Sequence, residues 1–500
     1  MCFVDYTKAF DLINRSAMFA KLMKNGVSTK IINIIKSLYS KMKLGIKNDV
    51  SNRKFASNLG VLQGEVCSPV IFSLFINDLP EYLSDDSLGV QVVDILIKIL
   101  MFADDMAIFS TTREGLQTGL NNLHSYCRKW GITVNTEKTK IVVFRKGGKL
   151  SKDDKWSFNG NNIQVVNIFK YLGCHLSTQC TFKTHIDKAV ESARKGLFLL
   201  KQYISTNPEI LPKSQLEIFD TMIKPILTYG SEVWGLYNLN SIETFYLSFL
   251  KSILFVKKST PNCYIYGDLG VYPLEIEIKM GVVKYWLKII RPKTSHDNYV
   301  RKIYLQLLFL NITNPNQITW VSQVKDMFNS MGLGFIWNRQ KVSNETQFLK
   351  IFRQRLEDMY KQEWHAQVSR TTDGRIYKSI KDTFEFENYL QLPKHLRIAI
   401  SKIRMSSHLF YIERGRWYNI KRIERVCNLC QEIEDEYHLA INCPRFCNEL
   451  KCYLPTYLKE SPNVFKFIKF LKSKDESQIK QLGYLCYKLH KEYKKELLSI

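Results

Sequence analysis

The alternation of apolar and polar residues in the first 150 positions predicts short buried strands mixed with helices. The runs "ILIKILMF" (95–102) and "MAIF" (106–109) are short, apolar and rich in β-forming residues, so we interpret each as a buried strand. A tight Ala-Asp-Asp connection joins them, which predicts a hairpin. A third run of this kind, "CFV" (2–4), ends at Asp5. Strands and helices mixed in this way predict an α/β or α+β layered fold.

Helical patterns account for much of the remaining chain. Segment 184–204 is a clear case, because its apolar residues form one stripe at helical spacing and its basic residues fall largely elsewhere. The stripe consists of Ile186, Ala189 or Val190, Ala193, Leu197, Leu200 and Tyr203 or Ile204. The other predicted helical segments are 17–42, split by Asn25-Gly26, then 69–83, which starts at a proline, and 116–131, which ends at Gly131. Residues 205–290 and 453–500 are also helical in pattern, whereas 291–400 carry no chemical signature.

The charge of the chain is strongly positive, with 72 Lys and Arg against 47 Asp and Glu, a formal net charge of +25. This excess favours a polyanionic partner, nucleic acid or an anionic membrane surface, although it also fits a merely basic soluble protein. No uninterrupted apolar run reaches the roughly 18 residues of a membrane span, and the start "MCFVDYTKAF" lacks the layout of a signal peptide. The 12 cysteines are therefore expected to be reduced thiols or metal ligands of an intracellular protein.

Two adjacent aspartates, Asp104 and Asp105, interrupt the apolar hairpin. Buried charges are costly unless they are paired or bind a metal, although a surface hairpin tip would also accommodate them. If the strand 2–4 pairs beside the hairpin, Asp5 meets Asp104 and three carboxylates surround one point. Such a cluster raises its own pKa values unless cations neutralise it. Two Mg²⁺ ions held this way suit phosphoryl transfer, because one activates the attacking hydroxyl and the other steadies the leaving phosphate.

A second group of chemically active residues lies in "CNLCQEIEDEYHLAINC" (427–443). Its pattern C-x2-C-x7-H-x4-C has the ligand types and spacing of a closed tetrahedral zinc site. The four ligands would be Cys427, Cys430, His438 and Cys443. Reduced structural cysteines near a histidine are the alternative, and Cys447 and Cys452 are close enough in sequence to confuse the assignment.

The segment 401–426, just before the Cys/His pattern, is strongly basic. Its basic residues are interleaved with aromatic ones, which suits phosphate contacts combined with base stacking. The basic residues are Lys402, Arg404, Arg414, Arg416, Lys421, Arg422 and Arg425, and the aromatic ones are Phe410, Tyr411, Trp417 and Tyr418. We therefore predict that the region 401–452 binds nucleic acid.

Five blocks in order resemble the motifs of a known family, the reverse transcriptases of non-LTR (LINE-like) retrotransposons. The blocks are "FVDYTKAFD" (motif A), "GVLQGEVCSPVIFSLFINDL" (motif B), "MFADDMAIF" (motif C), "WGITVNTEKTKIVVF" (motif D) and "FKYLGCHLS" (motif E). Any one block is a weak signal, but five in the family order are a specific one. The match is close over residues 1–180, and the Cys/His pattern resembles, more loosely, the zinc knuckle that follows the polymerase in such elements.

The resemblance implies an RNA-directed DNA polymerase that uses an RNA template, a DNA primer, deoxynucleoside triphosphates, two Mg²⁺ ions and one structural Zn²⁺. It implies an α+β palm, with an antiparallel sheet packed on helices, and four regions after it. The expected regions are the palm 1–180, a helical thumb 181–290, a connector 291–400, a basic region with a zinc knuckle 401–452 and a helical tail 453–500. An intracellular, nuclear location is expected, with no membrane partner.

The resemblance also assigns catalytic roles to the acidic residues. Asp5 and Asp104 are expected to be the main Mg²⁺ ligands, with Asp105 completing the carboxylate cluster. Lys138 matches the motif D lysine, which stabilises or protonates the leaving pyrophosphate. An ordinary strand-end cap is the alternative for Asp5, and a surface lysine for Lys138.

Further positions match residues that contact the nucleotide and the primer. Phe10 matches the gate that collides with a ribose 2′-OH, although plain core packing is the alternative. Gln63 and Gly64 match the motif B turn, which departs from the commoner form at the Glu-Val-Cys that follows. The expected primer grip is Tyr171, Leu172 and Gly173.

Asp5 lies almost at the start, whereas the family has a fingers region before motif A. We therefore expect a reading frame truncated at its 5′ side or begun at an internal methionine, with an incomplete site. One alternative is a non-catalytic relic that still binds nucleic acid. Another two-metal polymerase or nuclease is disfavoured, because Phe-Ala-Asp-Asp with a following "YLG" fits reverse transcriptases better.

Overall fold

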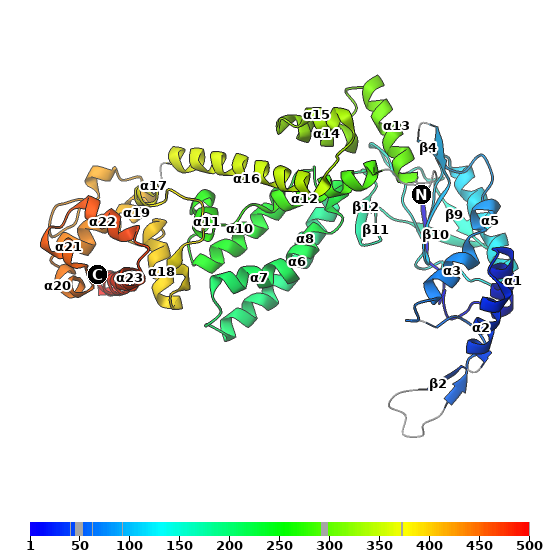
Figure 1. Ribbon diagram of the computed structural model, residues 1–500, viewed down its shortest axis with the longest axis horizontal. Helices are drawn as coiled ribbons and strands as arrows, with labels where there is room; N and C mark the ends of the chain where they lie inside the picture. Colours follow the sequence, from blue (N-terminus) through cyan, green and yellow to red (C-terminus); the bar gives the residue numbers. More distant parts are fainter. Residues whose placement is uncertain are drawn as a thin grey trace. The chain divides into compact units, whose positions relative to one another are not determined.

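The computed structural model (Figure 1) describes residues 1–40, 42–45, 54–62, 64–92, 94–291, 299–371 and 374–499. The chain divides into two units, of which the first comprises residues 1–185 and 293–322 and the second residues 186–292 and 323–500. The first unit mixes strands and helices, and the second is built from helices. The expected mixture of sheet and helices is thus confirmed for the chain as a whole.

The first unit is organised around a six-stranded sheet with the strand order β6-β7-β1-β8-β10-β9. Neighbouring strands are antiparallel except β8 and β10, which are parallel. The strands are β1 (Cys2–Val4), β6 (Ile99–Phe102), β7 (Asp105–Ile108), β8 (Lys140–Ile141), β9 (Trp156–Phe158) and β10 (Asn161–Val165). The predicted hairpin is confirmed as β6 and β7, and β1 pairs beside it. The run 95–102 holds two strands, because Ile95–Ile97 (β5) pairs with Val90–Val92 (β4) instead.

The central strand β1 is buried on both faces, because side chains alternate across a strand. Cys2 and Val4 belong to a core shared with the helices on one side of the sheet. Phe3 belongs to a second core on the other side, which includes Ala107 of β7 and receives Phe169. Phe169 lies in the hairpin of β11 (Ile168–Tyr171) and β12 (Cys174–Ser177). The sheet therefore lies between a layer of helices and this hairpin.

The helices of the first unit follow most of the predicted boundaries. They are α1 (Arg15–Lys24), α2 (Thr29–Ser40), α3 (Ser68–Ile76), α4 (Leu79–Tyr82), α5 (Arg113–Trp130) and, from the later segment, α13 (Tyr299–Thr313). The break at Asn25-Gly26 and the end of α5 at Gly131, whose φ is 69°, are confirmed. The single helix predicted for 69–83 is wrong, because two helices, α3 and α4, occupy it. Pro80 explains the break, since it lacks an N–H and its ring clashes with the preceding turn.

The second unit begins within α6 (Lys183–Thr206), where the predicted apolar stripe is buried from Ile186 to Leu200 and Tyr203 is exposed. Other helices that matter below are α11 (Asn262–Leu269), α16 (Glu345–Arg370), α18 (Lys394–Arg404), α19 (Tyr411–Trp417), α22 (Val464–Leu471) and α23 (Glu476–Ser499). Three fully buried tryptophans, Trp234, Trp286 and Trp364, mark its core. None of the described helices is both long and apolar enough to cross a membrane.

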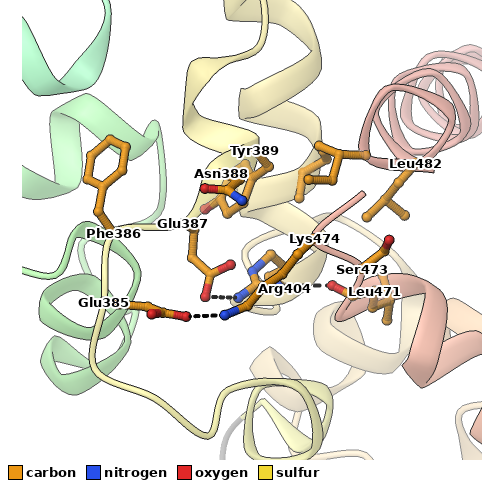
Figure 2. Close-up of a pocket in the computed structure, with 12 residues that line it drawn as sticks. Glu385, Phe386, Glu387, Asn388, Tyr389, Arg404, Leu471, Ser473, Lys474 and Leu482 are labelled. Atoms are coloured by element: carbon orange, nitrogen blue, oxygen red, sulfur yellow. Dashed lines mark hydrogen bonds and ion pairs between the residues drawn. The ribbon is translucent and has the colours of Figure 1, made fainter. Parts of the chain in front are cut away.

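A buried ion pair ties α11 to α18. Asp268 is fully buried, and Arg404 donates from Nε to Oδ2 at 3.0 Å and from Nη2 to Oδ1 at 3.2 Å. The hydroxyl of Tyr389 donates to the same carboxylate at 2.8 Å. Figure 2 shows the adjoining pocket, where Arg404 also contacts Glu387 and the carbonyl of Leu471. Arg404, predicted with the nucleic-acid-binding basic residues, is therefore a structural residue, because its guanidinium is enclosed and satisfied within the protein.

Candidate active site and metal centre

The predicted catalytic aspartates lie at one end of the central strands of the sheet. Val4 of β1 faces Met106 of β7, so the register continued by one residue sets Asp5 opposite Asp105. Asp104 lies in the turn between β6 and β7, after Ala103, whose φ is 51°. The residue across the ladder from Asp5 is therefore Asp105, and Asp104 lies next to it in the turn.

The three carboxylates act on one another electrostatically. Burial raises the pKa of Asp105, and the charges of Asp104 and Asp5 raise it further. Mutual repulsion of this kind favours a bound cation, because a cation removes the cost of gathering like charges. Oxygen ligands suit Mg²⁺, so the chemistry of these three side chains fits the predicted metal ions.

The motif D segment fixes both Asp5 and Lys138. The backbone N–H of Asn135 donates to the carbonyl of Asp5 at 2.8 Å, and the N–H of Asp5 donates to Thr139 Oγ1 at 3.2 Å. The side chain of Asn135 accepts from the backbone N–H of Lys138 at 3.1 Å. The Lys138 ammonium then lies 4.0 Å from Oδ2 of Asp5, with both side chains partly open to solvent. The structure thus brings Lys138 to the aspartates.

The predicted primer-grip residues form the turn of the β11–β12 hairpin. Tyr171 pairs with Cys174, and the two residues between them, Leu172 and Gly173, have φ values of 45° and 84°. Positive φ at both positions is typical of a type I′ turn, which favours glycine at the second one. Burial raises the pKa of Tyr171, and the charge of Asp105 raises it further, which shows that this hairpin lies close to the carboxylates.

The hairpin is held there by aromatic packing. The rings of Phe3 and Phe169 are stacked with centroids 4.4 Å apart, and Phe3 also contacts Tyr171 at 5.2 Å. Because Phe3 lies two residues before Asp5, this packing fixes the hairpin relative to the strand that carries a catalytic aspartate.

The predicted nucleotide-contacting residues lie on the helical side. Phe10 is partly buried, and its ring contacts Phe72 of α3 with centroids 4.9 Å apart. The carbonyl of Phe10 accepts from the N–H of Val61 at 2.8 Å, which joins motif A to the start of motif B. Gly64 is exposed with a φ of 89°, a conformation that favours glycine. Gln63 lies outside the described residues.

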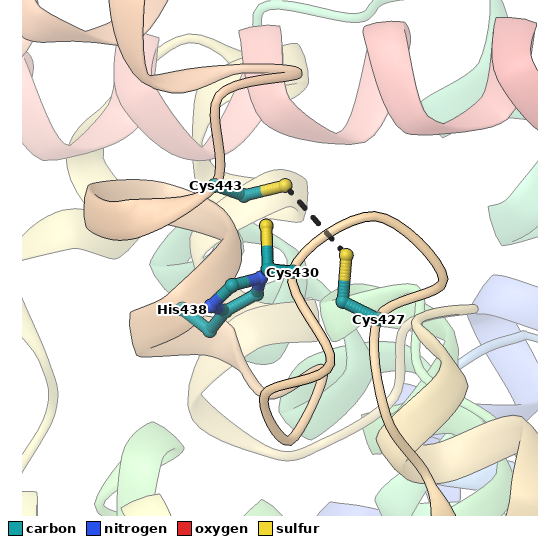
Figure 3. A group of neighbouring side chains, drawn as sticks. All are labelled: Cys427, Cys430, His438 and Cys443. Carbon is teal, nitrogen blue, oxygen red and sulfur yellow. Dashed lines mark hydrogen bonds between the residues drawn. The ribbon is translucent and has the colours of Figure 1, made fainter.

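The four predicted zinc ligands come together in the second unit (Figure 3). One ligand atom from each of Cys427, Cys430, His438 and Cys443 lies within 4.8 Å of all the others. The Sγ atoms of Cys427 and Cys443 are 4.0 Å apart. The loop closes because the backbone N–H of Cys427 donates to the carbonyl of Glu432 at 2.7 Å. Three sulfurs and one nitrogen at this separation fit a tetrahedral Zn²⁺.

The histidine of this cluster is oriented as a metal ligand. Its Nδ1 atom lies 2.8 Å from Oε2 of Glu432, whereas Nε2 is buried without a hydrogen-bond partner in the described structure. A carboxylate on one ring nitrogen commonly fixes the other nitrogen toward a metal. A buried, unpaired Nε2 among three sulfurs is therefore an observation that favours a missing ion.

The thiols of the cluster differ in their proton affinity, since burial and the neighbouring Cys427 and Cys443 raise the pKa of Cys430 to about 12. Burial raises the pKa of Cys427, but the backbone N–H of Cys430, the His438 ring and the charge of Arg445 outweigh it and lower the pKa to about 7. Arg445 donates to Cys427 Sγ and to Cys443 Sγ, each at 3.2 Å. Cys447 and Cys452 instead contact Asn448 and a backbone carbonyl, so among the described residues they lie outside the cluster.

Comparison with known proteins agrees with the geometry of the first unit. Residues 1–176 match the family described as "Reverse transcriptase (RNA-dependent DNA polymerase)". The first 176 residues belong to the reverse transcriptase family. The chain is 26% identical over 308 residues to "RNA-directed DNA polymerase from mobile element jockey" of Drosophila funebris, a match that covers 59% of this chain and 32% of that protein.

A second similar protein is "Retrovirus-related Pol polyprotein from type-1 retrotransposable element R2" of Popillia japonica. It is 26% identical over 360 residues, which are 66% of this chain and 57% of that protein. A third, "Putative 115 kDa protein in type-1 retrotransposable element R1DM" of Drosophila melanogaster, is 24% identical over 309 residues, 59% of this chain and 29% of that protein. The resemblance to non-LTR retrotransposon reverse transcriptases is confirmed, and the chain spans about a third of the length of the jockey relative.

The reverse transcriptase domain also depends on residues that sequence reasoning missed. Arg15 donates to the carbonyls of Gly60, Ser57 and Leu59 at 2.9, 2.6 and 3.0 Å, and so holds the segment that leads into motif B. A Cβ on Gly60 would lie 2.4 Å from the carbonyl oxygen of Asp11, so only glycine fits there. These contacts join positions far apart in sequence, and no pattern in the residues around Arg15 predicts them. Glu432, the partner of His438, was missed for the same reason.

Proposed function

We propose that this chain carries the polymerase of a retrotransposon protein, which extends a DNA primer along an RNA template. The observation that carries the proposal is the position of Asp5, Asp104 and Asp105 at one end of the central strands, where burial and the charges of Asp104 and Asp5 raise the pKa of Asp105. These side chains would hold two Mg²⁺ ions, which supply charge for the attacking hydroxyl and the leaving phosphate. The substrates would be deoxynucleoside triphosphates.

The residues near the three aspartates would have separate roles in binding the nucleotide, the primer and the leaving pyrophosphate. Lys138, 4.0 Å from Asp5, is placed to hold or protonate the pyrophosphate as it leaves. Phe10, partly buried against Phe72, would exclude a ribose 2′-OH by its bulk. The turn Leu172-Gly173 next to Tyr171 would orient the primer end. Orientation of this kind supplies a large part of the rate in reactions that join two bound substrates.

We also propose that Cys427, Cys430, His438 and Cys443 hold one structural Zn²⁺. Four protein ligands leave no open position for substrate, so the site would stabilise the loop rather than take part in catalysis. The assigned regions beyond the palm, namely a helical thumb, a connector and a basic region with a zinc knuckle, are part of the same proposal. Within the basic region, Arg425 donates to the carbonyls of Ile412 and Ile420, so its guanidinium is already occupied within the protein. Other basic residues of the region would therefore contact nucleic acid.

Primer extension by the purified chain, with an RNA template and Mg²⁺, tests the polymerase proposal. Asp104→Asn is expected to lose several orders of magnitude in rate, because it removes a charged metal ligand. Asp86→Asn is the matched control, since Asp86 is an exposed aspartate of the same unit that pairs with Lys98 at 3.7 Å. A fully active Asp104→Asn variant would refute the function.

The zinc proposal is tested by elemental analysis of the purified chain. One zinc per chain is expected, and Cys430→Ser should abolish it. Cys452→Ser is the control, because that thiol is exposed and outside the cluster. Equal zinc in Cys430→Ser and the parent would refute the site.

A further inference from the structure

A cavity of about 330 Å³ lies between α18, the segment 405–410 and α23 in the second unit. Its walls are largely apolar and aromatic, with Phe410 and Tyr487 among them. Three lysines, Lys402, Lys491 and Lys494, also line it. A volume of this size is at the lower end of the range for small-ligand sites, so it suits a single planar ring system.

His490, one of the residues that line the cavity, has a hydrogen-bond acceptor without a partner in the described part of the chain. The Nδ1 atom of His490 donates to the carbonyl of Cys486 at 2.9 Å, so the lone pair of the neutral ring is on Nε2. That Nε2 atom is shielded from solvent and has no partner in the described structure. Burial lowers the pKa of His490 to about 3, and the charges of His408 and Lys402 act in the same direction, so the ring is neutral at physiological pH.

The lysines of the cavity are not neutralised by the protein. Burial lowers the pKa of Lys402, and the nearby charge of Lys494 lowers it further. Within the part of the chain that the structure describes, none of the three lysines forms an ion pair. Lys488 and Lys495, which lie on α23 with Lys491 and Lys494, are both paired with Glu492. His408 also lines the cavity; its Nε2 donates to Glu436 at 2.8 Å, and its Nδ1 accepts from the backbone N–H of Phe410 at 3.3 Å. The cavity therefore presents uncompensated positive charge.

We propose that this cavity receives one unstacked base of a single-stranded nucleic acid, with the flanking phosphates on Lys402, Lys491 and Lys494. The aromatic walls offer stacking, which is tolerant of base identity. The Nε2 atom of His490 accepts an N–H from the base edge. A purely apolar ligand has no such donor. The proposal extends the proposed action on nucleic acid, on which it rests, by naming a strand-holding site remote in sequence from the catalytic aspartates.

Fluorescence anisotropy with the full-length chain tests this site. The probes are a labelled 12-nucleotide uridine oligomer in RNA and DNA forms, and an abasic oligomer of the same length. Tyr487→Ala should weaken binding of the base-bearing oligomers about tenfold, the effect of losing one stacked base, and leave the abasic oligomer unchanged. His490→Phe should weaken the same binding and leave the abasic oligomer unchanged, because it removes the acceptor that the base would use. The substitution also removes the hydrogen bond from Nδ1 to the carbonyl of Cys486, so the abasic oligomer is the control for a structural effect. An equal loss of binding for the base-bearing and abasic oligomers would make His490 a structural residue only.

The phosphate contacts are tested by salt dependence. The double variant Lys491→Ala/Lys494→Ala should reduce the slope of log affinity against log salt by about 1.4, since two phosphate contacts are lost on a single strand. Lys488→Ala/Lys495→Ala is the matched control, because it removes the same charge from the same helix but from paired lysines. An equal loss of slope in both double variants would overturn the proposal.

A direct map separates this proposal from the polymerase function. Ultraviolet crosslinking of a 5-iodouridine oligomer, followed by peptide mass spectrometry, should label Tyr487, which is the exposed aromatic side chain of the cavity. Bound oligomer with no crosslink in 398–410 or 487–494 would overturn the cavity assignment even if primer extension succeeds. A crosslink there in a chain that fails to extend primers would support the cavity and refute only the polymerase.

Discussion

The Lys138 ammonium lies 4.0 Å from Oδ2 of Asp5, although the two residues are far apart in the sequence. The contact exists because the segment around Asn135 is hydrogen-bonded to the backbone of Asp5. The distance is too long for a tight pair, and both side chains are partly open, so the lysine remains free to move toward a leaving group.

We therefore expect Lys138→Ala to lower the rate of primer extension by about 10²-fold, the usual range for a lost proton donor, with primer–template affinity unchanged. Lys138→Arg distinguishes the two roles of the lysine. Arginine keeps the positive charge but does not release a proton at physiological pH. Rescue by arginine would mean that charge alone matters, and single-turnover kinetics give the rates.

Asp105→Asn should raise the melting temperature of the metal-free protein. Burial and the charges of Asp104 and Asp5 raise the pKa of Asp105, so the folded state disfavours its ionised form. A raised pKa means that the ionised carboxylate destabilises the fold above that pKa, and removing the charge relieves it. Added Mg²⁺ should stabilise the parent more than this variant, which keeps the two main ligands but lacks the third carboxylate. Scanning fluorimetry gives the melting temperatures without and with Mg²⁺, and Asp86→Asn is the control. A metal-free melting temperature of Asp105→Asn below that of the parent would contradict the prediction.

Phe10→Ala should keep DNA synthesis and relax discrimination against ribonucleotides, because it removes the bulk that a 2′-OH would meet. The ring also contacts Phe72, so some loss of stability is expected. Phe10→Tyr preserves the ring and should preserve discrimination. The measurement is the ratio of kcat/KM for deoxynucleotides to that for ribonucleotides. A Phe10→Ala variant that still rejects ribonucleotides would make Phe10 a packing residue only.

Glu432→Gln should weaken zinc affinity by about 10- to 100-fold, because the carboxylate orients the ring of His438 through a 2.8 Å contact. The variant keeps all four ligands, so the metal stoichiometry at saturating zinc should be unchanged. Glu424→Gln, a short distance along the chain, is the control. Competition with a zinc-binding dye gives the affinities, and equal values for both variants would show that Glu432 is dispensable.

Asp268→Asn should destabilise the second unit by about 3 kcal/mol, because the buried guanidinium of Arg404 loses its fully buried carboxylate partner and keeps the partly exposed Glu387. Burial raises the pKa of Asp268, but the charges of Arg404 and Lys381 outweigh it, so the pKa is lowered overall. The stability that this pair contributes is therefore present at neutral pH. It is lost as the pH falls below the usual pKa of an aspartate, which applies to the unfolded chain, and then through the lowered pKa of Asp268 in the folded protein.

Urea unfolding at several pH values measures this effect. Lys474→Ala is the control, because Lys474 forms only an exposed pair with Glu385, and such pairs contribute little. An Asp268→Asn variant that unfolds like the parent at neutral pH would show that the pair is not needed for stability.

The sequence by itself determined the elements whose signal is local. The hairpin of β6 and β7, the strand before Asp5, the end of α5 at Gly131 and the spacing of the four Cys and His residues all follow from neighbours within a few positions. Strand periodicity, turn residues and ligand spacing act over such distances, so they can be read without the fold.

Only the tertiary structure decided which charges are paired, and with what. It set Asp5 opposite Asp105, enclosed Arg404 against Asp268 and gave His438 its carboxylate in Glu432. It also left the Nε2 atom of His490 without a partner among the residues that the structure describes. Burial and pairing depend on residues brought together from distant parts of the chain, and the energy of a charge changes with both. For that reason Arg404 resembled a nucleic-acid contact in the sequence and is a buried structural residue in the fold.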